Sequence, residues 1–187
     1  MKLLIATTNP DKLKEYRRLL RPWRLIMVQP GPVPQETGST FKQNAIIKAK
    51  FYGQKYNLPI LADDSGLEIK ALNGFPGVRS ARYAKGNFET ARQVLLKRLA
   101  GMPRRTARFV CVIALYRPAK PITTFTGVVS GQIAVRELGQ RGFGYDPIFY
   151  LPRLKKTFGQ LTRKEKALYS HRGRAAKKLI AFFKKSM

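Results

Sequence analysis

Two adjacent aspartates, Asp63 and Asp64, follow an apolar run in the stretch LADDSGLEIKALNGFPGVRSARY. Carboxylate oxygens at the end of a strand suit Mg²⁺, which usually takes one or two carboxylates together with phosphate oxygens and water. Ser65 and Gly66 then offer a hydroxyl and a backbone N–H group to a phosphate. The plainer interpretation is a turn after a strand, in which the aspartates cap backbone groups. Taken alone, the tetrapeptide favours the turn.

Other polar residues could act with this pair. Glu36 lies in the loop sequence QETG, and Lys12 begins a helical pattern directly after the turn TTNP. In that turn the backbone N–H groups of Thr7, Thr8 and Asn9 would lie near a helix N-terminus, which is a ready anion site. Each residue also has a plain interpretation, as a solvated glutamate, a surface lysine or an ordinary helix cap.

Aromatic and basic residues gather toward the C-terminus. The loop GFGYDP at residues 142–147 combines glycines and aromatics with Asp146, and its aromatic rings could stack on a base. His171, the only histidine, stands beside Arg172. Alternatively, the loop is a turn whose aromatic side chains lie in the core, and His171 is a structural histidine.

Periodicity indicates the elements that must position these residues. Alternating or continuous apolar runs predict strands, and apolar residues three or four apart predict helices. The expected strands are 2–6, 24–29, 59–63, 67–72, 106–116 and 122–135, the last broken at Ser130–Gly131, and the expected helices are 11–20, 40–56, 88–102, 163–170 and 174–185. Strands and helices interspersed in this way predict a mixed α/β sheet.

Length and composition limit the class of protein. The 187 residues, 44% of them apolar, suit one globular domain over residues 1–187. Because no apolar run approaches the ~20 residues of a membrane span, we expect a cytoplasmic protein with no membrane contact. Cys111 is the single cysteine. It cannot form an internal disulfide, and we expect a buried, inert thiol in a reducing compartment.

The chain is strongly basic. It has 37 Lys and Arg residues against 10 Asp and Glu, a net charge of +27. Such a charge indicates a polyanionic partner, either nucleic acid or phosphorylated small molecules. The alternative is a basic composition that only solubilises the surface.

Taken together and in order, several segments resemble one family. These are TTNPDKLKE, ETGSTFKQNAIIKA, LADDSGLEIKALNGFPGVRSARY, GFGYDPIF and LTRKEKALYSHRGRA. They resemble the inosine/xanthosine triphosphate pyrophosphatase family over Leu4 to Ala181. The resemblance implies an elongated mixed β-sheet in two lobes with flanking helices, and an active-site cleft between the lobes.

The resemblance also implies an activity and a set of phosphate-binding residues. Members hydrolyse deaminated purine nucleoside triphosphates (ITP, dITP, XTP) to the monophosphate and pyrophosphate with Mg²⁺. Matching motifs assign Asp64 as the general base, Glu36 and Asp64 as metal ligands, and Asp63 as a ligand through water. Residues expected at the phosphates are Thr7, Thr8, Asn9, Lys12, Lys48 and Ser65.

The same resemblance places base recognition in the C-terminal half. Phe143 matches the residue that stacks on the base, and Asp146 matches the group that reads it, with Gly144 and Tyr145 in the same loop. Lys166, His171 and Arg172 match the other residues of the base pocket. A nucleoside triphosphate is then the substrate and a homodimer is expected. Nucleic acid is not required, although the high basicity of the chain allows nonspecific contact with it.

Two departures and two alternatives accompany this interpretation. The family pattern has glutamates where this chain has Gln35 and Gln43, so metal affinity would change if either supports the metal. A nucleic-acid-binding protein with the same fold is one alternative, although it would not need Glu36, Asp63 and Asp64. A septum-formation-type nucleotide pyrophosphatase is the other, although it would carry a Ser/Arg-rich loop in place of TTNPDK.

Overall fold

The computed structural model describes residues 2–21, 23–29 and 31–185 and shows a seven-stranded sheet. The strand order is β2-β1-β3-β4-β5-β6-β7. β1 pairs in parallel with β2 and β3, whereas β6 pairs antiparallel with β5 and β7. The expected mixed α/β sheet is therefore confirmed. The expected domain 1–187 includes residues 1, 22, 30, 186 and 187, which lie outside the described residues.

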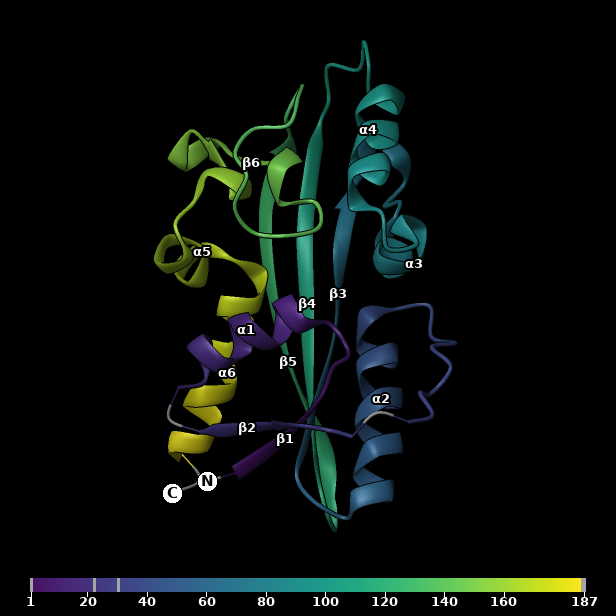
Figure 1. Ribbon diagram of the computed structural model, residues 1–187, viewed down its shortest axis with the longest axis vertical. Coiled ribbons are helices and arrows are strands. Elements are labelled where there is room, and N and C mark those ends of the chain that lie inside the picture. Colours follow the sequence, from purple (N-terminus) through teal and green to yellow (C-terminus); the bar gives the residue numbers. More distant parts are fainter. Residues whose placement is uncertain (1, 22, 30, 186–187) are drawn as a thin grey trace. The chain divides into compact units, whose positions relative to one another are not determined.

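The elements have the following bounds (Figure 1). The strands are β1 (Lys2–Ala6), β2 (Arg24–Met27), β3 (Ile60–Ile69), β4 (Thr106–Arg117), β5 (Lys120–Ile133), β6 (Phe149–Leu151) and β7 (Lys156–Thr157). The α-helices are α1 (Pro10–Leu19), α2 (Phe41–Tyr56), α3 (Ser80–Ala84), α4 (Phe88–Arg98), α5 (Arg163–Tyr169) and α6 (His171–Lys185).

The chain divides into two compact units. Unit 1 comprises Met1–Asp64, Cys111–Gly127 and His171–Met187, and unit 2 comprises Ser65–Val110 and Val128–Ser170. β3, β4 and β5 each contribute residues to both units. Each unit has a hydrophobic core of its own.

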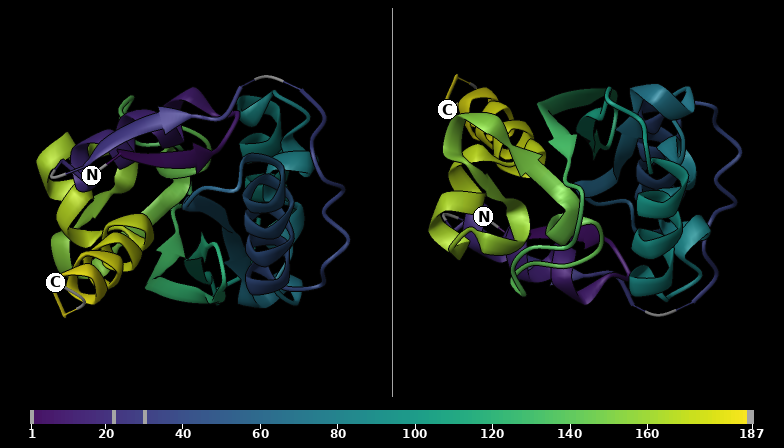
Figure 2. Two further views of the ribbon diagram at one scale, coloured as in Figure 1. Left: turned by 90° about the horizontal axis from the view of Figure 1, so that it is seen from below. Right: turned by 90° about the horizontal axis from the view of Figure 1, so that it is seen from above.

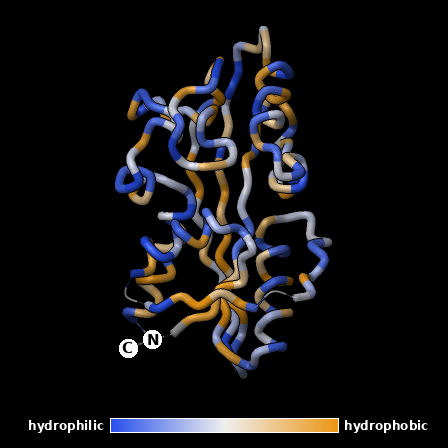
Figure 3. Tube along the Cα trace, in the orientation of Figure 1, coloured by the Kyte–Doolittle hydropathy of each residue, from blue (hydrophilic) through white to orange (hydrophobic). Residues whose placement is uncertain are grey.

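Unit 1 is layered around its strands. α2 lies on one side of them, and α1 and α6 lie together on the other (Figures 1 and 2). β1 and β2 are hydrophobic along most of their length (Figure 3). Most of β1 is buried, whereas β2, at the edge of the sheet, has only Leu25 buried. The core between these layers includes Leu3, Ile5, Leu13, Tyr16, Leu20, Leu61, Cys111, Ile113, Leu115, Ala176 and Leu179.

Side-chain caps fix where the helices begin. Asn9 caps α1, and its side-chain oxygen accepts from the backbone N–H groups of Asp11 (2.9 Å) and Lys12 (3.0 Å). Thr40 caps α2 in a capping box with Gln43, whose side-chain oxygen accepts from the Thr40 N–H at 3.1 Å. Either Glu or Gln serves at that position of the motif. Gln43 is thus an exposed capping residue of α2.

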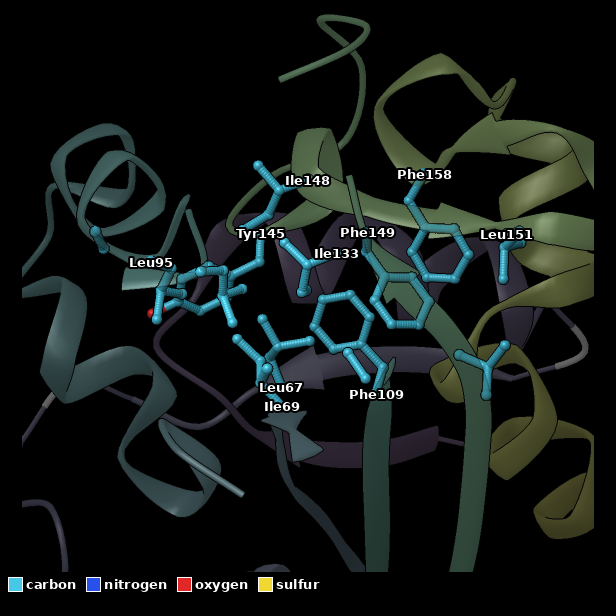
Figure 4. Packing of buried hydrophobic residues seen from close by; sticks show 14 of the residues in the cluster. Leu67, Ile69, Leu95, Phe109, Ile133, Tyr145, Ile148, Phe149, Leu151 and Phe158 are labelled. Atoms are coloured by element: carbon cyan, nitrogen blue, oxygen red, sulfur yellow. The ribbon is translucent and has the colours of Figure 1, made fainter. Parts of the chain in front are cut away.

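The core of unit 2 is built around aromatic rings (Figure 4). Phe109 stacks on Phe158 with 5.7 Å between ring centroids, and Phe149 lies 4.6 Å from Phe109 and 5.0 Å from Phe158. Leu67 and Ile69 from β3 and Leu95 from α4 complete the same cluster. Tilted and offset aromatic pairs of this kind stabilise a core beyond the area they bury.

Two expected strand breaks are wrong. β3 runs without interruption from Ile60 to Ile69, so Ser65 and Gly66 form no turn. β5 likewise runs through Ser130–Gly131. Glycine is required at position 131 because the backbone of β6 approaches closely. A Cβ atom there would lie 2.4 Å from the Tyr150 carbonyl oxygen. A glycine within a strand can mark the close approach of another backbone instead of a turn.

The single thiol behaves as expected. Cys111 is fully buried, and its Sγ lies 3.5 Å from the Tyr16 hydroxyl. Burial raises the pKa of Cys111 to about 12, so the thiol stays protonated and unreactive at neutral pH. Within the part of the chain that the structure describes, no helix is long and apolar enough to span a membrane.

The aromatic cluster yields a stability prediction. Phe158→Ala should lower the free energy of unfolding by about 3–5 kcal/mol, because it leaves a cavity against Phe109 and Phe149. Leu168→Ala, at a position 68% exposed on α5, is the control and should change it by less than about 0.5 kcal/mol. Urea denaturation followed by circular dichroism measures both. Equal effects of the two substitutions would contradict the packing described.

Candidate functional site

The two adjacent aspartates of β3 have different lysine partners. Successive side chains of a strand point to opposite faces, and α1 and α2 lie on opposite sides of the unit 1 strands (Figure 2). Lys12 of α1 donates to Asp63 Oδ2 at 2.9 Å. Lys48 of α2 lies 3.8 Å from Asp64 Oδ1. The strand thus separates two like charges and gives a lysine to each.

Asp63 is held as a carboxylate. Burial alone would raise its pKa, because Asp63 is only 2% exposed. The positive charges of Lys12, Arg172 and Lys48 outweigh burial and lower the pKa of Asp63 to about 2. Asp63 is therefore ionised throughout the neutral range.

At Asp64 the factors that raise the pKa outweigh those that lower it. Burial raises its pKa, Lys48 and Lys12 lower it, and the nearby Glu36 and Asp63 carboxylates raise it further, with a net upward shift. A raised pKa makes a carboxylate a better proton acceptor near neutral pH. Two carboxylates whose pKa values are moved apart commonly have separate acid–base roles.

Lys48 joins Asp64 to the loop that carries Glu36. Its ammonium lies 2.7 Å from Glu36 Oε1, closer than it lies to Asp64. Burial lowers the pKa of Lys48, but Asp64, Asp63 and Glu36 together raise it above its ordinary value. Lys48 therefore remains a cation beside the two carboxylates.

The expected phosphate turn forms at the expected place. It follows β1, with Thr7 buried and Thr8 exposed. Within the turn, the Asn9 N–H donates to Thr7 Oγ1 at 3.2 Å, while the Asn9 side chain caps the next two N–H groups. The Asn9 side-chain oxygen is therefore committed to the start of α1, and the positive charge available at this turn comes from Lys12.

The donor set fits Mg²⁺ bound together with phosphates. Among the described residues, no cluster of three or more His, Cys, Asp or Glu side chains is arranged to hold a metal ion alone. Glu36 and Asp64, however, converge on the Lys48 ammonium. Two carboxylates are enough for Mg²⁺ when substrate phosphates and water fill its other positions. These two residues would be the ones to hold it.

A second polar group lies in unit 2, around Asp146. Asp146 is 2% exposed, and its Oδ2 accepts from the Phe143 N–H at 2.7 Å and from Lys166 Nζ at 2.5 Å. The Lys166 ammonium also lies 4.5 Å from the centroid of the Phe143 ring. Three of the residues expected to bind the base are thus brought into direct contact.

Glycine makes this arrangement possible. Gly142 has a φ of +78°, and a Cβ atom there would lie 2.1 Å from Asp146 Oδ2. Any side chain at position 142 would therefore displace the carboxylate that holds Lys166.

Tyr145 of the same loop is a core residue. It is 3% exposed, and its hydroxyl donates to the Ser80 carbonyl oxygen at 2.8 Å. Gly144 next to it accepts from Arg92 of α4 at 2.9 Å, and Arg92 also pairs with Glu137 at 2.9 Å. These contacts anchor the loop to the body of unit 2.

The remaining expected residues fall in different places. Arg172 is 2% exposed within unit 1 and pairs with Glu15 of α1 at 2.5 Å, over the Tyr16 ring. His171 is also buried, at the first position of α6. Ser65 lies within β3, half-buried, as the first residue of unit 2. Arg172 and His171 thus belong to unit 1, whereas Lys166 and Asp146 belong to unit 2.

Sequence reasoning missed three residues of these clusters. Asn44 is fully buried and donates to Asp64 Oδ2 at 3.3 Å while accepting from the Gly38 N–H at 2.8 Å. Glu15 and Arg92 were missed as well. Asn44 could have been found, because a polar residue on the apolar stripe of a helix requires a buried partner. Glu15 and Arg92 carry no such signal.

The Lys12–Asp63 pair yields a prediction about stability. The pKa of Asp63, about 2 in the folded state, lies below its unfolded value of about 3.9, so ionised Asp63 in its whole environment contributes about 2–3 kcal/mol above about pH 4. This contribution is lost as the pH falls toward about 2. Lys12→Gln raises the pKa of Asp63, so it should destabilise strongly at about pH 7 and much less at about pH 3.

Urea unfolding at the two pH values measures this difference. Lys14→Gln is the matched control, because Lys14 is 73% exposed and pairs only with the half-exposed Asp11 on the same helix. It should be close to neutral at both pH values. A loss for Lys12→Gln that does not depend on pH would show that the ion pair is not its cause.

Nearly the whole chain is similar to known proteins. The model of the Ham1 family matches residues 3–182. A dITP/XTP pyrophosphatase from an Exiguobacterium species is 45% identical over 97% of this chain and 96% of its own length, and one from Thermus thermophilus is 43% identical over 98% and 92%.

Solved structures agree with the sequence matches. The Staphylococcus aureus Ham1 protein superposes with a TM-score of 0.92 at 41% identity over 100% of both chains. A HAM1 protein from Coxiella burnetii gives 0.89 at 41% identity over 99% of both chains. With its fold, its motifs and nearly its full length matched, the chain belongs to the Ham1 family.

Proposed function

We propose that this protein hydrolyses deaminated purine nucleoside triphosphates, namely dITP, ITP and XTP, to the monophosphate and pyrophosphate. Relatives named dITP/XTP pyrophosphatase at 42–45% identity over nearly the full chain support the substrate class. The main structural support for the hydrolysis is the environment of Asp64, a buried carboxylate that has a raised pKa and lies beside the Lys48 ammonium. Asp63, its neighbour in the chain, differs because its pKa is lowered to about 2.

In this proposal Asp64 acts as the general base. It removes a proton from a water molecule while the water oxygen attacks the α-phosphorus. The bond from the α-phosphorus to the α,β-bridging oxygen breaks, and pyrophosphate leaves. Asn44 holds the acceptor carboxylate in place through its 3.3 Å hydrogen bond, so the orientation of Asp64 is set before substrate binds.

The lysines supply fixed positive charge. Lys12 and Lys48 are 17% and 15% exposed, so both retain access to solvent. A triphosphate could take the place of a carboxylate at either ammonium. Cations already in position stabilise the charge that develops on a phosphoryl group in the transition state without having to reorganise. Asp63 fixes Lys12 in this role and stays ionised itself.

The carboxylates Glu36 and Asp64 would hold Mg²⁺ with the substrate phosphates, as their donor chemistry allows. When bound, the ion neutralises phosphate charge and polarises the scissile phosphorus. The side chains of Gln35 and Gln43 are exposed, and Gln43 serves the capping box of α2. Replacing the glutamates of the family pattern at these positions therefore leaves this carboxylate pair intact.

The Phe143–Asp146–Lys166 group of unit 2 is proposed to bind the purine base. Lys166 is fixed by Asp146 and is a donor suited to the 6-oxo group of hypoxanthine or xanthine. Adenine presents an amino donor at that position. A buried donor facing it would lose its acceptor, and such a mismatch can discriminate by about 10⁴-fold or more.

Replacing the base tests the reaction. Asp64→Asn should lower kcat for ITP in the presence of Mg²⁺ by roughly 10²- to 10⁴-fold, because an amide cannot accept the proton. Separation of the products by ion exchange should give IMP and pyrophosphate from the unaltered protein. Inosine diphosphate and phosphate would contradict the proposed bond cleavage.

The control for this variant is Glu89→Gln, at an exposed position of the first turn of α4. It removes one carboxylate and should leave kcat within about twofold. Near-normal turnover by Asp64→Asn, with its circular dichroism unchanged, would show that another group is the base.

A glycine substitution tests the base site. Gly142→Ala places a methyl group against Asp146 Oδ2 and should raise KM for ITP by roughly tenfold or more. It should leave intact the carboxylate–lysine cluster of unit 1, which consists of Lys12, Glu36, Lys48, Asp63 and Asp64. Gly86→Ala is the matched control, because Gly86 has a similar φ of +85° but open space around its Cβ position. Steady-state kinetics of both variants separates the clash with Asp146 from backbone strain. Equal changes in KM would remove the Asp146 group from base binding.

A further inference from the structure

The proposed reaction leaves most of the net charge of +27 without a role. Lys12, Lys48, Lys166 and Arg172 each pair with a carboxylate in the clusters described. Most of the other lysines and arginines among the described residues are exposed, and those of helix α6 are concentrated on one face.

Helix α6 has a predominantly basic exposed face. All of its residues are described, and its six exposed positions are Arg174, Lys177, Lys178, Ala181, Lys184 and Lys185. Each of these positions lies three or four residues from at least one position on the neighbouring turn, so they form one stripe along the helix. Five of the six are cations, and the helix sequence contains no acid. These five residues are called the basic stripe below.

Helix α1 extends the same surface. It packs against α6 on the same side of the unit 1 strands (Figures 1 and 2), and its exposed side includes Lys14 and Arg17. Of the acids on α1, Asp11 pairs with Lys14 at 3.5 Å and Glu15 is committed to Arg172. The two helices therefore present a surface on which cations greatly outnumber acids.

We propose that the basic stripe binds the phosphate backbone of nucleic acid without regard to sequence. From Arg174 to Lys185 the helix rises about 16 Å. One strand of a duplex places about five phosphates along that length, at about 3.4 Å per charge. The five cations of the stripe equal that number. This is a property of the surface of unit 1 and does not depend on the proposed hydrolysis.

The surface suits nucleic acid better than a membrane. Helices that lie on membranes combine basic residues with exposed Trp, Phe or Leu side chains that enter the lipid. The exposed face of α6 has only Ala181 as an apolar residue. Phe182 packs on Phe125, and Phe183 packs on Trp23, so both rings are engaged within unit 1.

A charge-matched pair of triple variants tests the proposal. The stripe variant is Lys177→Gln, Lys184→Gln and Lys185→Gln, and the control is Lys42→Gln, Lys50→Gln and Lys55→Gln on the exposed side of α2. Both remove three positive charges from unit 1, on opposite sides of its strands (Figure 2). None of these lysines belongs to the carboxylate–lysine cluster, so ITP hydrolysis should be unchanged in both.

Fluorescence anisotropy with a labelled mixed-sequence DNA duplex measures the affinity from about 50 to about 200 mM salt. The stripe variant should lose roughly tenfold or more in affinity at about 100 mM salt. The slope of log affinity against log salt concentration should also become shallower by about 2–3, because each lost phosphate contact reduces the slope by about 0.9. The control variant should keep most of the affinity and most of the salt dependence.

Three outcomes would overturn the proposal. The first is no binding by the unaltered protein at about 100 mM salt. The second is an equal loss in both variants, which would attribute binding to net charge alone. The third is binding to phosphatidylserine vesicles that depends on the stripe, with no stripe-dependent binding to DNA, which would assign the surface to a membrane.

Discussion

The alternation of side chains along β3 is the constraint on which the carboxylate–lysine cluster depends. Two adjacent aspartates on a turn would face each other's charge, whereas on a strand they point to opposite faces. Each then has its own helix and its own lysine, Lys12 from α1 for Asp63 and Lys48 from α2 for Asp64. The uninterrupted run of β3 from Ile60 to Ile69 is therefore a requirement of the chemistry as well as of the sheet.

This separation gives the two acids different protonation behaviour. The direct 2.9 Å contact with Lys12, supported by Arg172 and Lys48, outweighs burial at Asp63, while the longer 3.8 Å contact with Lys48 does not outweigh burial at Asp64. Asp63 is then a fixed anion that positions a cation, and Asp64 is the carboxylate able to take a proton. Their opposite pKa shifts follow from the charges around each carboxylate, since the two residues are neighbours in the chain and both are buried.

Much of this could be predicted from the sequence. Periodicity located the principal strands and most helices, and the resemblance to a known family implied that Glu36, Lys48 and Asp64 lie together. The failures arose where a local signal had a tertiary cause. Gly131 indicated a break, yet it makes room for the Tyr150 carbonyl of β6. Single-sequence patterns also gave no sign of partners far apart in the chain, such as Glu15 with Arg172 or Arg92 with Gly144.

Two groups among the lysines and arginines of the described residues differ physically, and the difference decides what each is suited to bind. Those that pair with carboxylates in the two clusters are held in one place, which suits them to one specific group of a small ligand. Those of the basic stripe are exposed and spaced by the helix repeat, without an acid on the same helix. Such a row suits a regular polyanion, because its attraction adds up over several phosphates and depends on salt. Net charge alone does not distinguish these two groups, whereas burial does.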